Sequence, residues 1–89
     1  MATVKIRVAA LLHSYTGGSK IIEVEASNVG DAIAALDRRF PGVAFRIIDE
    51  QQQIRQHMNI YLGEEKVHDL AAPIYPGAEI YIVGALSGG

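Results

Sequence analysis

The segment Pro76-Gly77-Ala78-Glu79-Ile80-Tyr81-Ile82-Val83 joins a turn to the densest run of β-forming residues in the chain. Pro-Gly suits the centre of a type II turn, in which the glycine takes a positive φ. Residues 79–83 predict a strand that is apolar on both faces, and such strands usually lie in the middle of a sheet. We therefore expect this strand to be central, with the other elements arranged around it.

Two segments nearer the N-terminus alternate polar and apolar residues, at positions 3–8 and 20–26. This alternation places apolar side chains on one face of a strand, so both segments predict half-buried strands. The connection between them ends in Gly17-Gly18, a pair that readily takes the positive φ of a chain reversal. If the strands pair antiparallel, outward charges can face each other across the pair. These charges are Lys5 and Arg7 on one strand and Glu23 and Glu25 on the other.

A helix is expected next, over residues 29–40. Its apolar residues fall on one stripe at helical spacing, with charged residues on the opposite side. Ser27-Asn28 offers a cap at the start, and Pro41-Gly42 ends the helix. Residues 43–57 contain apolar side chains without a clean period, and we expect a surface loop with apolar anchors there.

Residues 57–62 alternate again and predict another strand, followed by a turn at Gly63-Glu64-Glu65. The order strand, strand, helix, strand, strand predicts an α+β fold, a mixed sheet with one helix packed across it, which is the β-grasp arrangement of ubiquitin-like domains. The helix would act as the crossover that makes the first and last strands parallel. We expect a β-grasp domain over residues 1–84 and a flexible tail over residues 85–89. The predicted core is Val4, Ile6, Val8, Ile22, Val24, Val29, Ile33, Leu36, Phe40, Ile60, Leu62, Ile80 and Ile82.

Composition narrows the possible functions. The chain has 89 residues, which suffices for one small core, and its formal net charge of -2 gives no basic surplus for binding nucleic acid. It has no cysteine, which excludes a disulfide scaffold and a thiolate metal site within these residues. No apolar run is long enough to cross a membrane, and the N-terminus lacks the pattern of a signal peptide. We therefore expect a cytoplasmic protein with neither a nucleic-acid nor a membrane partner.

No familiar catalytic pattern is present. The histidines are His13, His57 and His68, and they lack the close spacing of a metal-binding pair. Neighbouring carboxylates such as Asp49-Glu50 point apart on an extended chain, which disfavours an acid–base pair. Gly17-Gly18 is not followed by the lysine of a phosphate-binding loop. A self-contained enzyme is therefore poorly supported.

The residues after the last strand, which end in Ser87-Gly88-Gly89, are the unusual feature. Glycine has no Cβ and adapts to any φ and ψ, so Gly-Gly can enter a channel too narrow for other residues. The carboxylate of Gly89 would be the reactive group, once activated in a form such as an acyl adenylate. Leu86 is an apolar side chain in this tail, and we expect a partner to bury it.

Over essentially its whole length, the chain resembles the ubiquitin-like sulfur-carrier family that includes the small subunit of molybdopterin synthase (MoaD), ThiS and CysO. The resemblance rests on the first strand, on the helix with Pro41, on Asn59-Ile60-Tyr61-Leu62, and above all on residues 76–82 leading to Ser87-Gly88-Gly89. Two departures stand at Ala78, where such families often have aspartate, and at Gly84, where they often have proline. The first removes a turn acceptor and the second loosens the root of the tail.

The resemblance implies a protein co-substrate rather than an enzyme. An adenylyltransferase of the ubiquitin-activating type would use ATP and magnesium on the carboxylate of Gly89, and persulfide sulfur would convert it to a thiocarboxylate. An acceptor enzyme, such as a molybdopterin synthase large subunit or a cysteine synthase, would then receive the sulfide. The chain itself would bind no cofactor and no metal. Molybdopterin, cysteine, thiamin and thiolated tRNA all stay open as the acceptor pathway.

A docking surface is expected on the sheet face that points away from the helix, because tyrosine is favoured at interfaces. Besides Leu86, the candidate partner-binding residues are Asn59, Tyr61, Tyr81 and Val83. Two other functions stay open. The chain could be a protein modifier joined to a lysine amine through Gly89, or an interaction module whose terminal glycines have no role.

Overall fold

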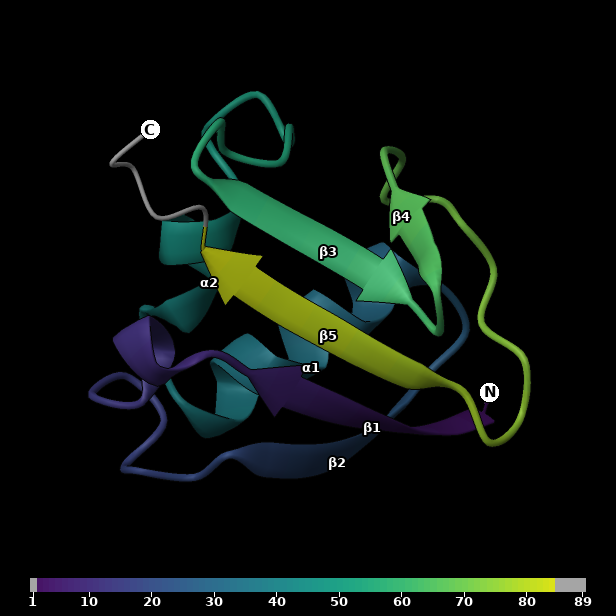
Figure 1. The fold of residues 1–89 in the computed structure, drawn as a ribbon, viewed down its shortest axis with the longest axis horizontal. Coiled ribbons are helices and arrows are strands. Elements are labelled where there is room, and N and C mark those ends of the chain that lie inside the picture. Colours follow the sequence, from purple (N-terminus) through teal and green to yellow (C-terminus); the bar gives the residue numbers. More distant parts are fainter. Residues whose placement is uncertain (1, 85–89) are drawn as a thin grey trace.

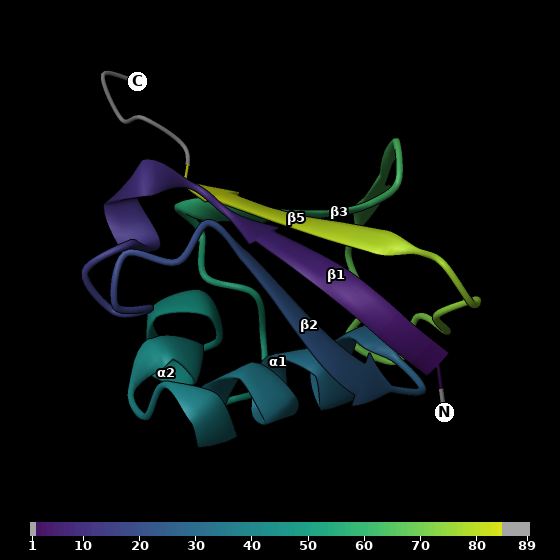
Figure 2. The same ribbon diagram turned by 90° about the horizontal axis from the view of Figure 1, so that it is seen from below.

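A computed structural model describes residues 2–84, which form a five-stranded sheet (Figure 1). The strands are β1 (Ala2–Val8), β2 (Ile21–Ala26), β3 (Met58–Leu62), β4 (Glu65–Val67) and β5 (Glu79–Gly84). The helical elements are the 3-10 helix η1 (Ala10–Leu12), α1 (Val29–Arg39) and α2 (Val43–Ile47). Figure 2 shows α1 and α2 on the same side of the sheet, so neither of these two helices covers the opposite face.

The strand order is β2-β1-β5-β3-β4, which places β5 in the centre. β5 runs parallel to β1 and antiparallel to β3. The predictions of a central last strand, of its parallel partner and of a mixed sheet crossed by a helix are therefore confirmed. Ile80 and Ile82 of β5 are fully buried against the helical layer.

The charge pairing predicted between β1 and β2 is wrong in part. Lys5 lies opposite Glu23 as expected, but Arg7 does not lie opposite a glutamate of β2. Buried apolar residues fix the register, and because the strands run antiparallel, Arg7 lies opposite Ile21 while Glu25 lies opposite Thr3. Arg7 instead forms an ion pair with Glu79 on its other neighbour, β5, with 2.7 Å between Nε and Oε1.

Two predicted core residues are only half-buried, namely Phe40 and Leu62. Phe40 is the C-cap of α1 and has left the helical conformation, so it no longer continues the buried stripe. Leu62 is the last residue of β3, beside the short strand β4. The core also contains buried residues that the sequence pattern did not select: Leu12, Ala26, Ala32, Ala35, Val43, Ile47, Ile48, Met58, Val67, Ile74 and Ala78.

The N-terminus of α1 is held by three acceptors. As predicted, Asn28 caps it: its Oδ1 accepts the backbone N–H of Asp31 at 2.7 Å. The N–H groups of the first two helical residues donate to the carbonyls of Ala72 and Leu70, at 3.0 and 2.8 Å. A Cβ at Gly30 would lie 3.3 Å from the Leu70 oxygen, so glycine permits this close approach. The connection between β4 and β5 is thereby tied to the helix.

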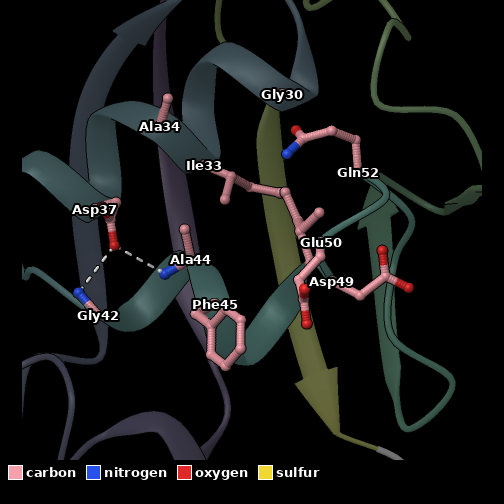
Figure 3. A pocket seen from close by; sticks show the side chains of 11 residues that line it. Gly30, Ile33, Ala34, Asp37, Gly42, Ala44, Phe45, Asp49, Glu50 and Gln52 are labelled. Carbon is pink, nitrogen blue, oxygen red and sulfur yellow. Dashed lines mark hydrogen bonds between the residues drawn. The ribbon is translucent and has the colours of Figure 1, made fainter.

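The expectation of a surface loop over residues 43–57 is wrong for residues 43–47, which form α2 and bury Val43 and Ile47 completely, whereas residues 48–57 contain no helix or strand. Asp37, on α1, explains this helix. Its Oδ1 accepts the backbone N–H groups of Gly42 and Ala44, each at 3.0 Å (Figure 3). A carboxylate from the preceding helix thus satisfies donors that the short helix cannot satisfy itself.

The turn predicted at Gly63-Glu64-Glu65 is one residue too long. Glu65 already belongs to β4, which pairs antiparallel with β3. Gly63 has a φ of 62°, which allows the tight reversal between the two strands. Three residues are too few for an alternating pattern to identify a strand, so β4 could be recognised only from its pairing.

Candidate functional site

The candidate site begins on the sheet face that lies opposite α1 and α2. Four side chains at alternate positions of β3 and β5 make up this outer sheet face: Asn59, Tyr61, Tyr81 and Val83. The register places Tyr61 opposite Tyr81 and Asn59 opposite Val83. Tyr81 is 36% exposed and the other three are half-buried, while the alternating residues Met58, Ile60, Ile80 and Ile82 are buried. The structure therefore brings all four residues together on one surface, as the alternation predicted.

A charged cluster adjoins this surface on β1 and β5. Glu79 Oε1 accepts hydrogen bonds from Arg7 Nε at 2.7 Å and from the hydroxyl of Tyr81 at 3.4 Å. The guanidinium carbon of Arg7 also lies 5.7 Å from the centre of the Tyr81 ring. The hydrogen bond from Arg7 lowers the pKa of Glu79, and the same bond raises the pKa of Arg7. The cluster holds the Tyr81 ring beside a fixed guanidinium.

The root of the predicted tail is fixed by neighbours on both sides. Gly84, the last residue of β5, pairs with Met58 of β3. On the other side, the Ile82 carbonyl accepts the backbone N–H of Ala9 at 2.9 Å. The end of β5 therefore has a defined position at one end of the sheet. Leu86, Ser87, Gly88 and Gly89, the other predicted site residues, lie outside the described residues.

The structure also brings together four residues that the sequence analysis did not select. The guanidinium carbon of Arg55 lies 4.5 Å from the centre of the Phe45 ring, and that of Arg46 lies 4.9 Å from the centre of the Tyr15 ring. These residues line a cavity of about 550 Å³ together with Met58, the partner of Gly84. They come from three separate segments without periodic spacing, so no sequence signal joined them.

Three carboxylates line the cavity between α1 and α2, those of Asp37, Asp49 and Glu50, and the first two accept backbone N–H groups (Figure 3). Asp37 is occupied as the cap of α2. Asp49 Oδ1 accepts the backbone N–H groups of Gln51 and Gln53, at 2.9 and 3.0 Å, which closes the loop before β3. Asp37 and Asp49 therefore have structural roles.

The histidines give no indication of a metal site in the described part of the chain. His13 Nε2 lies 3.1 Å from the Val8 carbonyl oxygen. No group of three or more histidine, aspartate or glutamate side chains converges anywhere within residues 2–84. Over the same residues, no helix is long and apolar enough to span a membrane.

A five-stranded mixed sheet, one long helix packed across it and a central last strand define a β-grasp protein of the ubiquitin-like class. The sequence model of the ThiS family matches residues 6–89, and the chain belongs to this family. It is a family of ubiquitin-like sulfur carriers and modifiers, whose members are small carrier proteins rather than catalysts. The comparison with curated protein sequences gave no match.

Solved structures agree with this assignment. A chain of the Amycolatopsis orientalis BexX/CysO complex is 27% identical, with a TM-score of 0.90, and the match covers 97% of this chain and 99% of that one. CysO from Mycobacterium tuberculosis is 26% identical, with a TM-score of 0.87 and coverage of 93% and 99%. SAMP1 from Haloferax volcanii is 25% identical, with a TM-score of 0.82 and coverage of 99% and 100%. The resemblance inferred from the sequence is therefore confirmed at the level of the family and the fold.

Proposed function

We propose that this chain is a sulfur carrier whose C-terminal Gly89 is converted to a thiocarboxylate. The observation that carries the proposal is the family match, which extends to residue 89 and so includes Ser87-Gly88-Gly89. The near-complete mutual coverage with CysO supports it, because the two chains correspond almost from end to end. The chain acts as a co-substrate, and the catalytic groups belong to its partners.

The first step is activation by an adenylyltransferase of the ubiquitin-activating type. A carboxylate oxygen of Gly89 attacks the α-phosphorus of ATP, pyrophosphate leaves, and an acyl adenylate forms. ATP and magnesium are bound by that enzyme and not by this chain. Gly88 and Gly89 present no side chain to the channel that leads to the nucleotide.

Sulfur then replaces AMP. The terminal sulfur of a persulfide attacks the activated carbonyl carbon, AMP leaves and an acyl disulfide forms. A second thiol of the donor cleaves the S–S bond, which yields the thiocarboxylate and a disulfide. After transfer to the acceptor's substrate, hydrolysis returns the carboxylate of Gly89. The acceptor is an enzyme of molybdopterin-type cofactor synthesis or of cysteine synthesis, such as a molybdopterin synthase large subunit or a cysteine synthase.

The fold would contribute a rigid body that presents this reactive end. β5 is hydrogen-bonded to β1 and to β3, so Gly84 has a fixed place from which the last five residues start. The outer sheet face lies on β5 and on β3, and Tyr61 and Tyr81 are its largest side chains. Partners that receive the tail would dock there, with Leu86 and Ser87 in the segment that they cover.

Conjugation to proteins is the second candidate function. The observation that favours it is the similarity to SAMP1 from Haloferax volcanii, which is described as a small archaeal modifier protein. Such a modifier would use the same acyl adenylate. The final nucleophile would then be a lysine amine of a target protein, and an amide would replace the thiocarboxylate.

Intact-mass measurement on protein purified from its native host tests the proposal. A carrier gives a species in which one sulfur replaces one oxygen, and this species disappears on treatment with an alkylating reagent that caps the thiocarboxylate. A modifier gives larger conjugates instead. Deletion of Gly88-Gly89 should abolish either product. If wild-type protein shows neither product and the deletion changes no cellular phenotype, the tail has no chemical role and an interaction module is the better description.

A further inference from the structure

Beside the root of the tail lies a second surface, distinct from the outer sheet face. We call it the arginine–aromatic face and define it by Tyr15, Phe45, Arg46, Arg55 and His57. It is centred on α2, which Figure 2 shows below the sheet on the helical side. Its residues line one cavity of about 550 Å³.

Arg55 is held in place by two contacts to one residue of α2. Its Nε donates to the Phe45 carbonyl at 2.6 Å, and its guanidinium carbon lies 4.5 Å from the centre of the Phe45 ring. A guanidinium that is stacked and anchored through Nε can still offer its two terminal nitrogens to a carboxylate. The side chain is thus oriented before any partner arrives.

Arg46 stacks in the same way on the connection between β1 and β2. Its guanidinium carbon lies 4.9 Å from the centre of the Tyr15 ring. Phe45 and Arg46 are consecutive in α2, so this short helix directs two adjacent side chains to two different segments. Phe45 nevertheless stays 58% exposed, the largest exposed fraction among the large apolar residues described. The exposed ring therefore offers apolar area beside the two guanidinium groups.

The charge of this face is opposite to that of the whole protein. Within residues 2–84, the ion pair that the structure contains joins Arg7 to Glu79, so neither Arg46 nor Arg55 is paired with a carboxylate there. The cavity is lined by two arginines and one glutamate, Glu50, which leaves +1, while the chain as a whole carries -2. An unneutralised positive surface on an acidic protein indicates complementarity to a negative partner surface.

The arginine–aromatic face is also continuous with the end of β5. Met58 lines the cavity and pairs with Gly84, the last described residue before the tail. The carbonyl of Arg55 accepts the backbone N–H of Met58 at 2.9 Å. This turn places Arg55 next to the residue that pairs with Gly84. The five residues that follow Gly84 span at most about 18 Å when extended. A protein that encloses the tail therefore meets this face.

We propose that the arginine–aromatic face docks an acidic segment of the enzyme that activates the tail. The segment presents carboxylates to the guanidinium groups of Arg46 and Arg55 and places an apolar side chain on the exposed ring of Phe45. This inference rests on the proposed function, because it assumes that an enzyme takes up the C-terminal residues. It adds a recognition surface on the helical side of the sheet to the outer sheet face.

Steady-state activation kinetics test the proposal with full-length protein. ATP–pyrophosphate exchange is measured with the host's own ubiquitin-activating-type enzyme, for the wild type and for the double variant R46E/R55E. The expected result is a KM for the carrier that rises about tenfold, with kcat nearly unchanged. The variant R38E/R39E is the matched control, since it reverses two exposed arginine charges on α1, and its KM should stay within about twofold. Equal KM values for the two double variants would overturn the proposal.

Two further measurements distinguish failure of the proposed docking surface from failure of the proposed function on which it rests. The single variant R46E removes only an exposed stacking contact, so it should stay folded even if R46E/R55E unfolds. Its KM for the activating enzyme should still rise about threefold. NMR titration of the wild type with the peptide Glu-Glu-Leu-Glu-Glu should shift the amide signals of residues 45, 46 and 55, whereas the peptide Gln-Gln-Leu-Gln-Gln should not. If exchange is absent with wild-type protein, the proposed function fails; shifts confined to other surfaces would overturn the docking surface itself.

Discussion

Asp37→Ala should uncap α2 and destabilise the protein by about 1–2 kcal/mol. The substitution removes the acceptor of two backbone N–H groups, those of Gly42 and Ala44, each held at 3.0 Å. Loss of a helix-capping acceptor costs about 0.5–2 kcal/mol, and the bond to Ala44 is partly buried, so the upper half of that range applies. For a domain of this size, the melting temperature should fall by roughly 5–15 °C.

Urea denaturation and amide hydrogen exchange provide the measurements. Urea gives the free energy of unfolding, and hydrogen exchange should show the largest loss of protection at Gly42 and Ala44. Asp37→Asn is the informative control, because an amide oxygen can still accept both bonds, and it should lose less than half as much stability. Arg38→Ala controls for a change on the exposed side of α1. The reasoning is refuted if D37A and D37N are equally destabilised, or if D37A is as stable as the wild type.

Two further predictions concern β5 and its turn. The pKa of Glu79 should lie below that of an ordinary glutamate, because Arg7 donates to its carboxylate; carboxyl NMR titration should show this pKa return to normal in Arg7→Gln. Any stability from this pair is present above the unfolded-state pKa and is lost as the pH falls through the lower folded-state value, so R7Q should be less sensitive to acid. Gly77→Ala should cost about 1–2 kcal/mol in urea, because φ is 82° there while the surrounding space is open; Gly77→Asn should cost less.

The sheet could be predicted from the sequence because its signals are local and periodic. Alternation in β1, β2 and β3 fixes which side chains face the helix, and the apolar run of β5 indicates its central position. The same alternation placed Tyr61 and Tyr81 on one surface before their pairing was known. For this surface, the alternation of side chains and the order of the strands lead to the same prediction.

α2 and the arginine–aromatic face could not be predicted, and both depend on contacts between segments. α2 has only five residues, too few for a helical period, and its cap is a carboxylate from α1. Arg55 became a candidate only through its stacking on Phe45, ten residues earlier in the chain. Such pairs follow from how helices and loops pack, and no spacing rule in the sequence encodes them.

Because β5 holds the root of the tail in place, substitutions that weaken docking and substitutions that slow the chemical step should affect different kinetic constants. Any shift of β5 along the sheet would break hydrogen bonds to β1 and to β3 together, so its last residue, Gly84, stays fixed when surface side chains change. Charge reversals at Arg46 and Arg55 should therefore alter KM, because they change binding in the ground state and the transition state alike. Changes at Gly88 or Gly89 should instead lower kcat, because they displace the reacting carboxylate.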